Sequence, residues 1–300
     1  ASKYGWPVST THSIIGAIVG FALVGISADS VMWGQVLEIV ASWIISPVFS
    51  GTIAFILFLS VEKLVLSREN PLKCAKTFVP YYMFLVGFVI AMVTLVKGLS
   101  HVGLRVTFSQ SVFLALAFAL LTVIIGIFLL RRLRLPDSDQ PTAKMQSVER
   151  VFGVLMIFTA CSMAFAHGSN DVANAIGPLA AINSVIANNG AFEAESALPV
   201  WILLLGGFGI VTGLAMWGHR VIRTIGKNIT ELTPSRGFAA EIAAATTVVI
   251  ASGTGIPVST THTLVGAVLG VGLARGMSAL NFGVVGRIFL SWIVTLPAGA

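Results

Sequence analysis

The sequence predicts an all-α, polytopic membrane protein. Of its 300 residues, 56% are hydrophobic and 10% are charged, and the mean hydropathy is +0.94. A soluble domain carries about 25% charged residues, so this composition argues against an ordinary soluble protein. Several apolar runs also reach the roughly 20 residues that an α-helix needs to cross a bilayer.

Seven apolar segments are expected to form the membrane helices, and they follow one another along the chain. The segment that begins at residue 151 extends into a polar cluster. In chain order the segments are 39–66, 78–96, 108–130, 151–166, 198–217, 238–251 and 282–300. This succession predicts an integral, multi-pass protein, which we expect in a bacterial inner (plasma) membrane.

A polar motif occurs twice within this apolar chain. The segment GWPVSTTHSIIGAIVG at 5–20 returns as GIPVSTTHTLVGAVLG at 255–270. The similarity continues to the Ser-Trp-Ile at 42–44, which matches the Ser-Trp-Ile at 291–293. A repeat of about fifty residues predicts the duplicated half of a transporter rather than a solenoid.

The charges of the loops predict how the two copies are oriented. Basic residues gather at 62–76, 131–150 and 219–236, whereas 183–199 has acidic residues and neither Lys nor Arg. The positive-inside rule places the first three in the cytoplasm and the fourth outside. The loop at 97–105 must then also lie outside, although it too carries basic residues. The two copies become oppositely oriented, which predicts an inverted-repeat transporter with broken helices and re-entrant hairpins.

The repeat also divides the chain. Residues 1–130 are expected to hold the C-terminal part of the first repeat with the helices that follow, 131–150 a cytoplasmic linker, and 151–300 a second repeat that is incomplete at its end. The second copy has membrane-like sequence before its motif that the first copy lacks, so we expect a fragment truncated at both ends. The basic linker could bind anionic lipid, but a solvated linker is favoured.

The net charge of +6 is explained by these basic loops. We therefore expect the lipid bilayer as a partner and no nucleic acid. Three GxxxG spacings, at 16–20, 209–213 and 266–270, are expected to mark close helix packing within the chain rather than a dimer seam.

A second polar cluster, HGSNDVANAIGPLAAIN, occupies 167–183. It is expected to interrupt the helix that begins near residue 151, because Gly168 loosens the backbone and the following Ser, Asn or Asp can cap a restarted helix. Asp171 and Asn174 are three residues apart and share one helix face. An acid at membrane depth indicates function; the alternative is that Asp171 only caps a helix near the interface.

The repeated PVSTTH motif predicts helix N-termini. Proline resists helix continuation, and Ser9 or Thr10, like Ser259 or Thr260, is a good N-cap. A helix N-terminus offers unpaired N–H groups and a positive dipole end, which suit an anion. The alternative is that these hydroxyls are only caps. Because the motif occurs twice in opposite orientations, a shared anion site is favoured.

Neither polar cluster contains Lys or Arg, so an anion would meet no fixed cation and would be repelled by Asp171. A bound cation resolves this conflict, because oxygen ligands from Asp171, Asn170 and Asn174 suit a hard ion such as Na⁺. A proton could serve instead, carried by His167 or by one of the two motif histidines, His12 and His262. A lone histidine in a membrane helix is, however, more often structural.

The segment HGSNDVANAIGP at 167–178 and the paired PVSTTH motifs resemble the inorganic phosphate transporter (PiT) family, whose signature reads GANDVANA. The resemblance covers essentially all of the chain. It implies symport of inorganic phosphate with Na⁺ or H⁺, an inverted-repeat fold and a homodimer. It assigns Asp171, Asn170 and Asn174 to the signature that binds the ion and phosphate. It assigns these hydroxyl residues to phosphate: Ser9, Thr10, Thr11, Ser259, Thr260 and Thr261.

Two other functions were compared with phosphate symport. Sulfate is another tetrahedral oxyanion, but it is fully deprotonated, and Asp171 could accept the O–H of phosphate, which favours phosphate. An enzyme would need paired carboxylates, HExxH or a similar metal motif, and the sequence has none of these. We therefore expect no enzymatic activity and no cofactor other than the coupling Na⁺ or H⁺.

Overall fold

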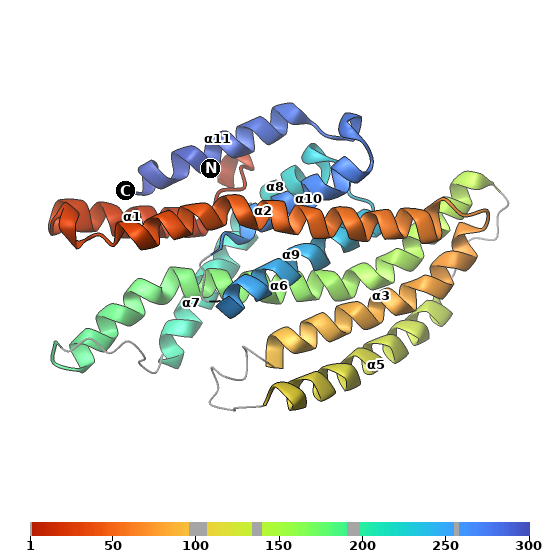
Figure 1. Cartoon of the computed structure of the whole chain (residues 1–300), viewed down its shortest axis with the longest axis horizontal. Helices are drawn as coiled ribbons and strands as arrows, with labels where there is room; N and C mark the ends of the chain where they lie inside the picture. Colours follow the sequence, from red (N-terminus) through yellow and green to blue (C-terminus); the bar gives the residue numbers. More distant parts are fainter. Residues whose placement is uncertain (1, 96–106, 134–139, 191–198, 255–257) are drawn as a thin grey trace.

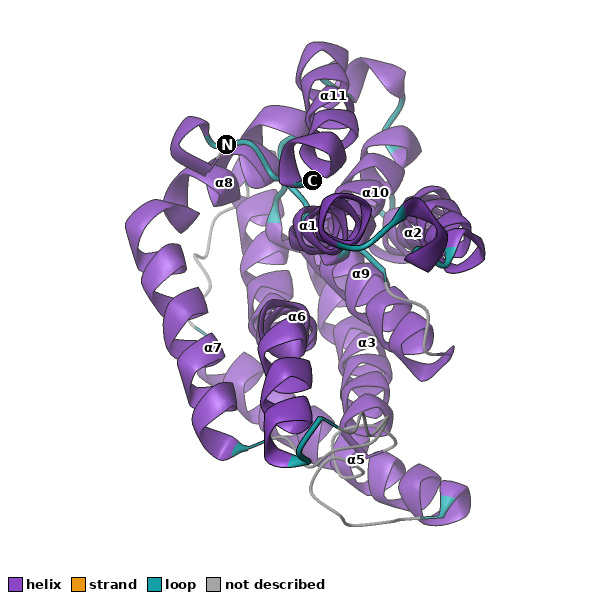
Figure 2. Cartoon of the chain, turned by 90° about the vertical axis from the view of Figure 1, so that its left-hand side faces the viewer, coloured by secondary structure: helices purple, strands orange, loops and turns teal. Residues whose placement is uncertain are grey.

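The computed structural model describes residues 2–95, 107–133, 140–190, 199–254 and 258–300, and within these residues it contains helices and turns but no strand (Figures 1 and 2). The α-helices are α1 (Thr10–Gly25), α2 (Trp33–Val61), α3 (Pro71–Val93), α5 (Phe108–Arg132), α6 (Pro141–Ala187), α7 (Val200–Gly213), α8 (His219–Arg223), α9 (Pro234–Thr254), α10 (Thr260–Ala274) and α11 (Phe282–Gly299). Short 3₁₀ and π segments join them: η1 (Ser2–Tyr4), η2 (Ala28–Ser30), η3 (Glu62–Leu66), η5 (Leu214–Gly218), η6 (Thr224–Ile229) and η7 (Met277–Ala279).

Six helical stretches among the described residues are long and apolar enough to cross a membrane. They are Trp33–Leu66, Pro71–Met92, Ser109–Arg132, Thr142–Ala187, Val200–Ile229 and Phe282–Gly299. These stretches confirm the predicted all-α, multi-pass protein. The remaining predicted span, 238–251, lies within α9, an alanine-rich helix that packs between α2, α6 and α10.

The predicted break in the helix at 167–171 is wrong, because α6 is one helix of 47 residues. Gly168 does not end it, and Ser169 does not cap a new helix; its hydroxyl donates to Ala166 O within the same helix at 3.1 Å. Asp171 and Asn174 instead direct their polar groups sideways, to hydroxyls of neighbouring helices. Lateral hydrogen bonds satisfy the polar side chains, so the backbone ladder can continue.

Local capping chemistry sets several helix boundaries. Thr107 and Gln110 form a reciprocal capping box at the start of α5. Asn70 accepts a hydrogen bond from the backbone of Lys73 at the start of α3, where Pro71 takes the first helical position. Residues 141–150, within the predicted linker, form the first turns of α6. The rest of that prediction at 134–139, the loop at 97–105 and much of 183–199 lie outside the described residues.

The two copies of the repeat pack against each other rather than each on itself. Each copy consists of a short apolar helix and a longer one, α1 with α2 and α10 with α11. The contacts exchange, because α1 packs on α11 and α10 packs on α2. Figure 1 shows the connection between α1 and α2 at the left of the view and the connection between α10 and α11 at the upper right.

Glycines make these crossings close. A Cβ added to Gly16 would lie 2.4 Å from Leu296 O, and one added to Gly266 would lie 2.3 Å from Pro47 O. The same substitution at Gly270 would place the Cβ 2.0 Å from Gly51 O. The 16–20 and 266–270 spacings therefore pack within the chain, as predicted. At 209–213, a Cβ on either glycine would meet nothing within 4 Å among the described residues. These two glycines therefore do not mark a close helix crossing within the described part of the chain.

Candidate functional site

The two polar motifs, over residues 7–12 and 258–262, contact each other, and each contains a helix N-terminus. Ser9 is the N-cap of α1 and Ser259 the N-cap of α10; each side chain accepts from the backbone N–H of the histidine three residues on, at 3.2 Å. The sequence allowed either the serine or the first threonine of each motif as the N-cap, and in the structure the serine is the cap in both. The serines are almost fully buried, which leaves the threonines that follow them to make other contacts.

The threonines join the two copies reciprocally. Thr11 donates its hydroxyl to Val258 O at 3.3 Å, and Thr261 donates to Val8 O at 3.2 Å. Each hydroxyl thus bonds the backbone of the other copy just before its helix begins. The positive dipole ends of two helices consequently lie side by side, and the first N–H groups of each helix have no partner within it.

Behind the threonines, two histidines and two tryptophans form a stacked cluster. The ring centroids of His12 and Trp43 are 3.5 Å apart, those of His262 and Trp292 are 3.6 Å apart, and those of the two histidines are 4.4 Å apart. Each histidine Nδ1 lies near the backbone oxygen of the other copy's tryptophan, at 3.2 and 3.1 Å. A carbonyl only accepts, so Nδ1 donates.

The two motif histidines thus pack within an aromatic cluster, and the Nε2 of each is buried without a hydrogen-bond partner among the described residues. Trp292 also donates its indole N–H to Pro7 O at 3.2 Å. A cavity of about 770 Å³ lies beside the cluster and is lined mainly by apolar residues of α2, α10 and α11. It contains neither Asp171 nor Asn174, so it is distinct from the polar junction of the threonines with α6.

Helix α6 supplies the charge and an amide to this junction. Thr260 donates to Asp171 Oδ1 at 3.0 Å, and Asn174 donates through Nδ2 to Thr11 Oγ1 at 3.1 Å. One α6 face, with Asp171 and Asn174 one turn apart, therefore bonds the first residue of α10 and the second residue of α1. The predicted grouping of the acid with both hydroxyl clusters is present in the geometry.

Asp171 also lies 3.2 Å from His167 Nε2, one turn earlier in α6. The Asp171 side chain is 14% exposed and that of His167 is 32% exposed, so the pair lies at the edge of the buried region. The Nδ2 of Asn170 is buried without a hydrogen-bond partner among the described residues. An ion bound here would find the carboxylate with two amide side chains within one turn of helix.

One predicted residue behaves differently from the rest. Thr10 is exposed, and no hydrogen bond joins its side chain to the other described residues, although the matching Thr260 bonds Asp171. Among the described residues no group of three or more His, Cys, Asp or Glu could hold a metal ion. Any Na⁺ would therefore need neutral oxygens beside the single carboxylate.

Sequence reasoning missed Glu241, a second acid on an apolar helix. Its Oε2 accepts from Thr159 of α6 at 2.6 Å, and α9 packs among α2, α6 and α10. The signal was present, because Glu241 is a single acid in the alanine-rich segment 238–251. An ionisable residue inside a predicted span indicates function, and the same reasoning that singled out Asp171 applies to it.

Known phosphate transporters are similar to this chain along its whole length. The model of the phosphate transporter family matches residues 1–300. A protein of Haemophilus influenzae proposed to be a phosphate permease is 51% identical over 300 residues, which cover all of this chain and 71% of the relative. Inorganic phosphate transporter 2-1, chloroplastic, of Arabidopsis thaliana is 43% identical over 328 residues, and the match covers all of this chain and 54% of that protein.

A solved structure gives the same result for the fold. The structure titled "The sodium-dependent phosphate transporter" superimposes with a TM-score of 0.87 at 40% sequence identity. The match covers 99% of this chain and 72% of the other.

Proposed function

The chain belongs to the phosphate transporter family, and on this basis we propose that it carries inorganic phosphate across a membrane in symport with Na⁺. The observation that carries the proposal is the junction of two helix N-termini with Asp171 and Asn174. Donors for a tetrahedral anion and a carboxylate for a cation occur there within hydrogen-bond distance of one another.

Phosphate would bind at the paired N-termini of α1 and α10. Helix N-termini bind phosphate elsewhere through unpaired N–H groups and the helix dipole. Asn174 adds an amide. Thr11, Thr260 and Thr261 add hydroxyls, which would turn to phosphate from the oxygens to which they now donate. Ser9 and Ser259 contribute indirectly, because they cap and so fix the two helix starts. Thr10 completes the pair of motifs and, being exposed, is available to a ligand.

The cation would bind beside phosphate, at Asp171 with the side-chain oxygens of Asn170 and Asn174. Hard cations prefer oxygen ligands, and a structurally similar protein is titled sodium-dependent; both support Na⁺. Without the cation, Asp171 would repel phosphate, so the anion binds well only when the positive charge is present. This electrostatic dependence is the proposed basis of coupling. His167, next to Asp171, is the group that would carry a proton instead.

The wider arrangement remains part of the proposal. We expect an inverted repeat, which the reciprocal threonine and histidine contacts support. We also expect a homodimer in a bacterial inner membrane, with the basic ends of the helices in the cytoplasm. The family is one of transporters, in agreement with the expectation that the chain is not an enzyme.

The test is uptake of labelled phosphate by the purified protein in liposomes, under an inward gradient of Na⁺, of K⁺ or of protons. We expect uptake only with Na⁺ and no competition by excess sulfate. Thr11→Val should lower uptake about tenfold or more, the loss of about 1.4 kcal/mol or more of binding. Its control is Thr212→Val on α7, whose hydroxyl donates to Phe208 O of its own helix.

Uptake driven equally by a proton gradient would reject Na⁺ as the coupling ion and direct attention to His167. Efficient counterflow of sulfate would reject phosphate specificity. Equal loss of uptake in the two threonine variants would show that the junction of α1 with α6 has no special role.

A further inference from the structure

Two buried histidines directly follow the hydroxyl residues of the proposed phosphate site. His12 is next to Thr11 in α1, and His262 is next to Thr261 in α10; the two histidines are 2% and 3% exposed. Each lies in the first turn of its helix, where the backbone N–H groups that would bind phosphate begin. A shift of either histidine therefore shifts one half of the site.

Each histidine contacts both copies of the repeat. The ring of His12 stacks on Trp43 of its own copy, and its Nδ1 donates to the backbone oxygen of Trp292 in the other copy. His262 makes the equivalent contacts, since it stacks on Trp292 and donates to the backbone oxygen of Trp43. Trp43 belongs to α2 and Trp292 to α11. The first turns of the two short helices are thus joined to the same two long helices.

Packing does not fix these side chains from every side. The cavity of about 770 Å³ borders all four residues of the cluster, so there is room for them to shift on that side. Because each Nε2 is buried without a partner, the Nδ1 bond is the one hydrogen bond that each imidazole makes with the described residues. A hydrogen bond restricts distance and angle closely, so these two bonds are the contacts that can hold the helix starts in place.

We propose that His12 and His262 are positioning residues for phosphate. Their Nδ1 bonds hold the N-termini of α1 and α10 at the separation at which both can bind one anion. This inference rests on the proposed phosphate site. Binding groups must be held within about 0.5 Å of the productive geometry by the residues that support them. The alternative is that the cluster only buries aromatic surface, so that the ring matters and the hydrogen bond does not.

Two substitutions at each histidine separate these roles. Phenylalanine keeps a stacking ring and lacks the donor, whereas asparagine keeps an N–H donor near the position of Nδ1 and lacks the ring. In liposomes, His12→Phe and His262→Phe should each raise the phosphate concentration for half-maximal uptake about fivefold, which corresponds to about 1 kcal/mol, and leave the maximal rate nearly unchanged. His12→Asn and His262→Asn should restore the phosphate affinity to within about twofold of wild type, or about 0.4 kcal/mol.

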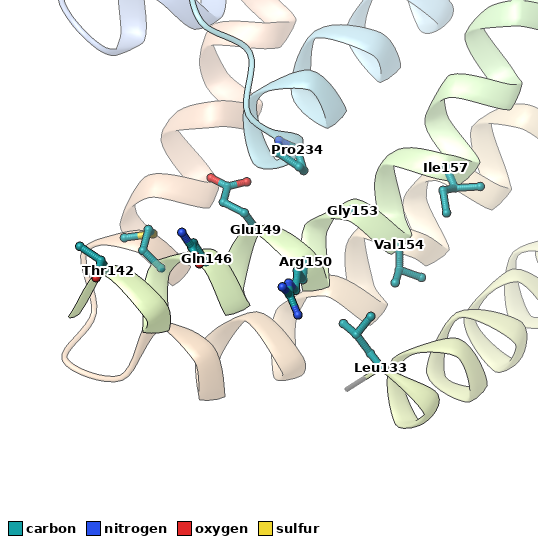
Figure 3. A pocket seen from close by; sticks show the side chains of 10 residues that line it. Leu133, Thr142, Gln146, Glu149, Arg150, Gly153, Val154, Ile157 and Pro234 are labelled. Atoms are coloured by element: carbon teal, nitrogen blue, oxygen red, sulfur yellow. The ribbon is translucent and has the colours of Figure 1, made fainter. Parts of the chain in front are cut away.

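The controls are His219→Phe and Gln146→Phe. His219 is exposed in α8. Gln146 is exposed on α6 itself, but in a groove of about 780 Å³ where that helix begins (Figure 3). At 1.5 Å per residue, it lies about 38 Å along the helix from Asp171. Neither control should change the phosphate affinity.

Hydrogen–deuterium exchange in detergent, without phosphate, tests the positioning separately from transport. Each phenylalanine variant should exchange faster than wild type at both helix starts, 12–17 and 262–267, because each bond joins the two copies. The asparagine variants should exchange like wild type. If the wild-type protein takes up no phosphate, the proposed function is wrong, and the exchange still decides whether the histidines hold the two helix starts together.

The outcomes of these measurements separate the two roles even if a phenylalanine variant is unstable. Weaker phosphate binding or faster exchange in the asparagine variants would overturn the inference, because the donor would then not be what matters. Unchanged affinity and exchange in folded phenylalanine variants would overturn it as well and leave a cluster that only packs. An equal loss of affinity in the controls would show that the effect is not specific to the two motif histidines.

Discussion

Replacement of Asp171 by Asn is the sharpest test of the proposed coupling site. The change keeps the shape of the side chain, and the Thr260 hydroxyl can still donate to the amide oxygen at the position where it now bonds Oδ1. Helix α6 should therefore keep its place, and the variant should insert and unfold like the wild type. What it loses is the negative charge.

The expected loss follows from the burial of that charge. The Asp171 side chain is 14% exposed. The effective dielectric constant around it should therefore lie between that of bulk water and that of a dry protein interior. At an effective dielectric constant of about 20, a unit charge about 4 Å away is attracted by about 4 kcal/mol. Since about 1.4 kcal/mol is a factor of ten, Na⁺ should bind several hundred-fold more weakly, and Na⁺-driven phosphate uptake should fall below detection.

The assay combines uptake in liposomes over a range of Na⁺ concentrations with thermal unfolding in detergent. The matched control is Asp29→Asn, because Asp29 is exposed in η2, outside the long helices. Uptake by Asp171→Asn within about threefold of wild type, less than 1 kcal/mol, would refute the reasoning. A lowered unfolding temperature with unchanged Na⁺ dependence would show instead that Asp171 acts as a structural partner of Thr260.

Three further predictions concern the junction and its surroundings. Asn174→Leu should remove the amide bond to Thr11 and weaken phosphate binding about fivefold, for a lost hydrogen bond of about 1 kcal/mol, as measured by the phosphate concentration for half-maximal uptake. Gly270→Ala should lower the unfolding temperature because the new Cβ would strike Gly51 O, whereas Gly286→Ala, which meets nothing within 4 Å, should leave it unchanged or raise it. Glu241→Gln should unfold like wild type, since Thr159 can donate to the amide oxygen, yet lose most of its Na⁺-driven uptake; normal uptake would make Glu241 a structural acid.

Much of the fold could be predicted because membrane helices depend on local composition. Runs of about 20 apolar residues have few alternatives in a bilayer, so the span at 108–130 appears as α5 with a difference of two residues at its end. The continuity of α6 could not be predicted in the same way. Gly168, Ser169 and Asp171 have local preferences for a break, and these were overridden by hydrogen bonds to Thr11 and Thr260, which are far away in the chain.

The part of the site that comes from the repeated motif could be predicted from the sequence. Two identical polar hexapeptides in apolar surroundings indicated one shared site, and Thr11 and Thr261 do bond across the copies. The exchange of partners, α1 with α11 and α10 with α2, could not be foreseen, because it depends on how Gly16 and Gly266 fit against backbone oxygens. Glu241 was overlooked because it is single and belongs to no repeated pattern.

The reciprocal contacts also explain why a chain this apolar contains the same polar motif twice. Thr11 needs the carbonyl of Val258, and Thr261 needs that of Val8. Each motif histidine stacks on the tryptophan of its own copy and bonds the backbone of the other. If one copy had only Leu or Val here, buried groups of the other would lose their partners, at about 1–3 kcal/mol each. Either motif alone would place polar groups in hydrocarbon at a large cost. Together they satisfy the threonine hydroxyls and the Nδ1 atoms of both histidines, although each histidine Nε2 is buried without a partner among the described residues. They also hold two helix N-termini side by side beside an acid, where we propose that an anion and a cation bind.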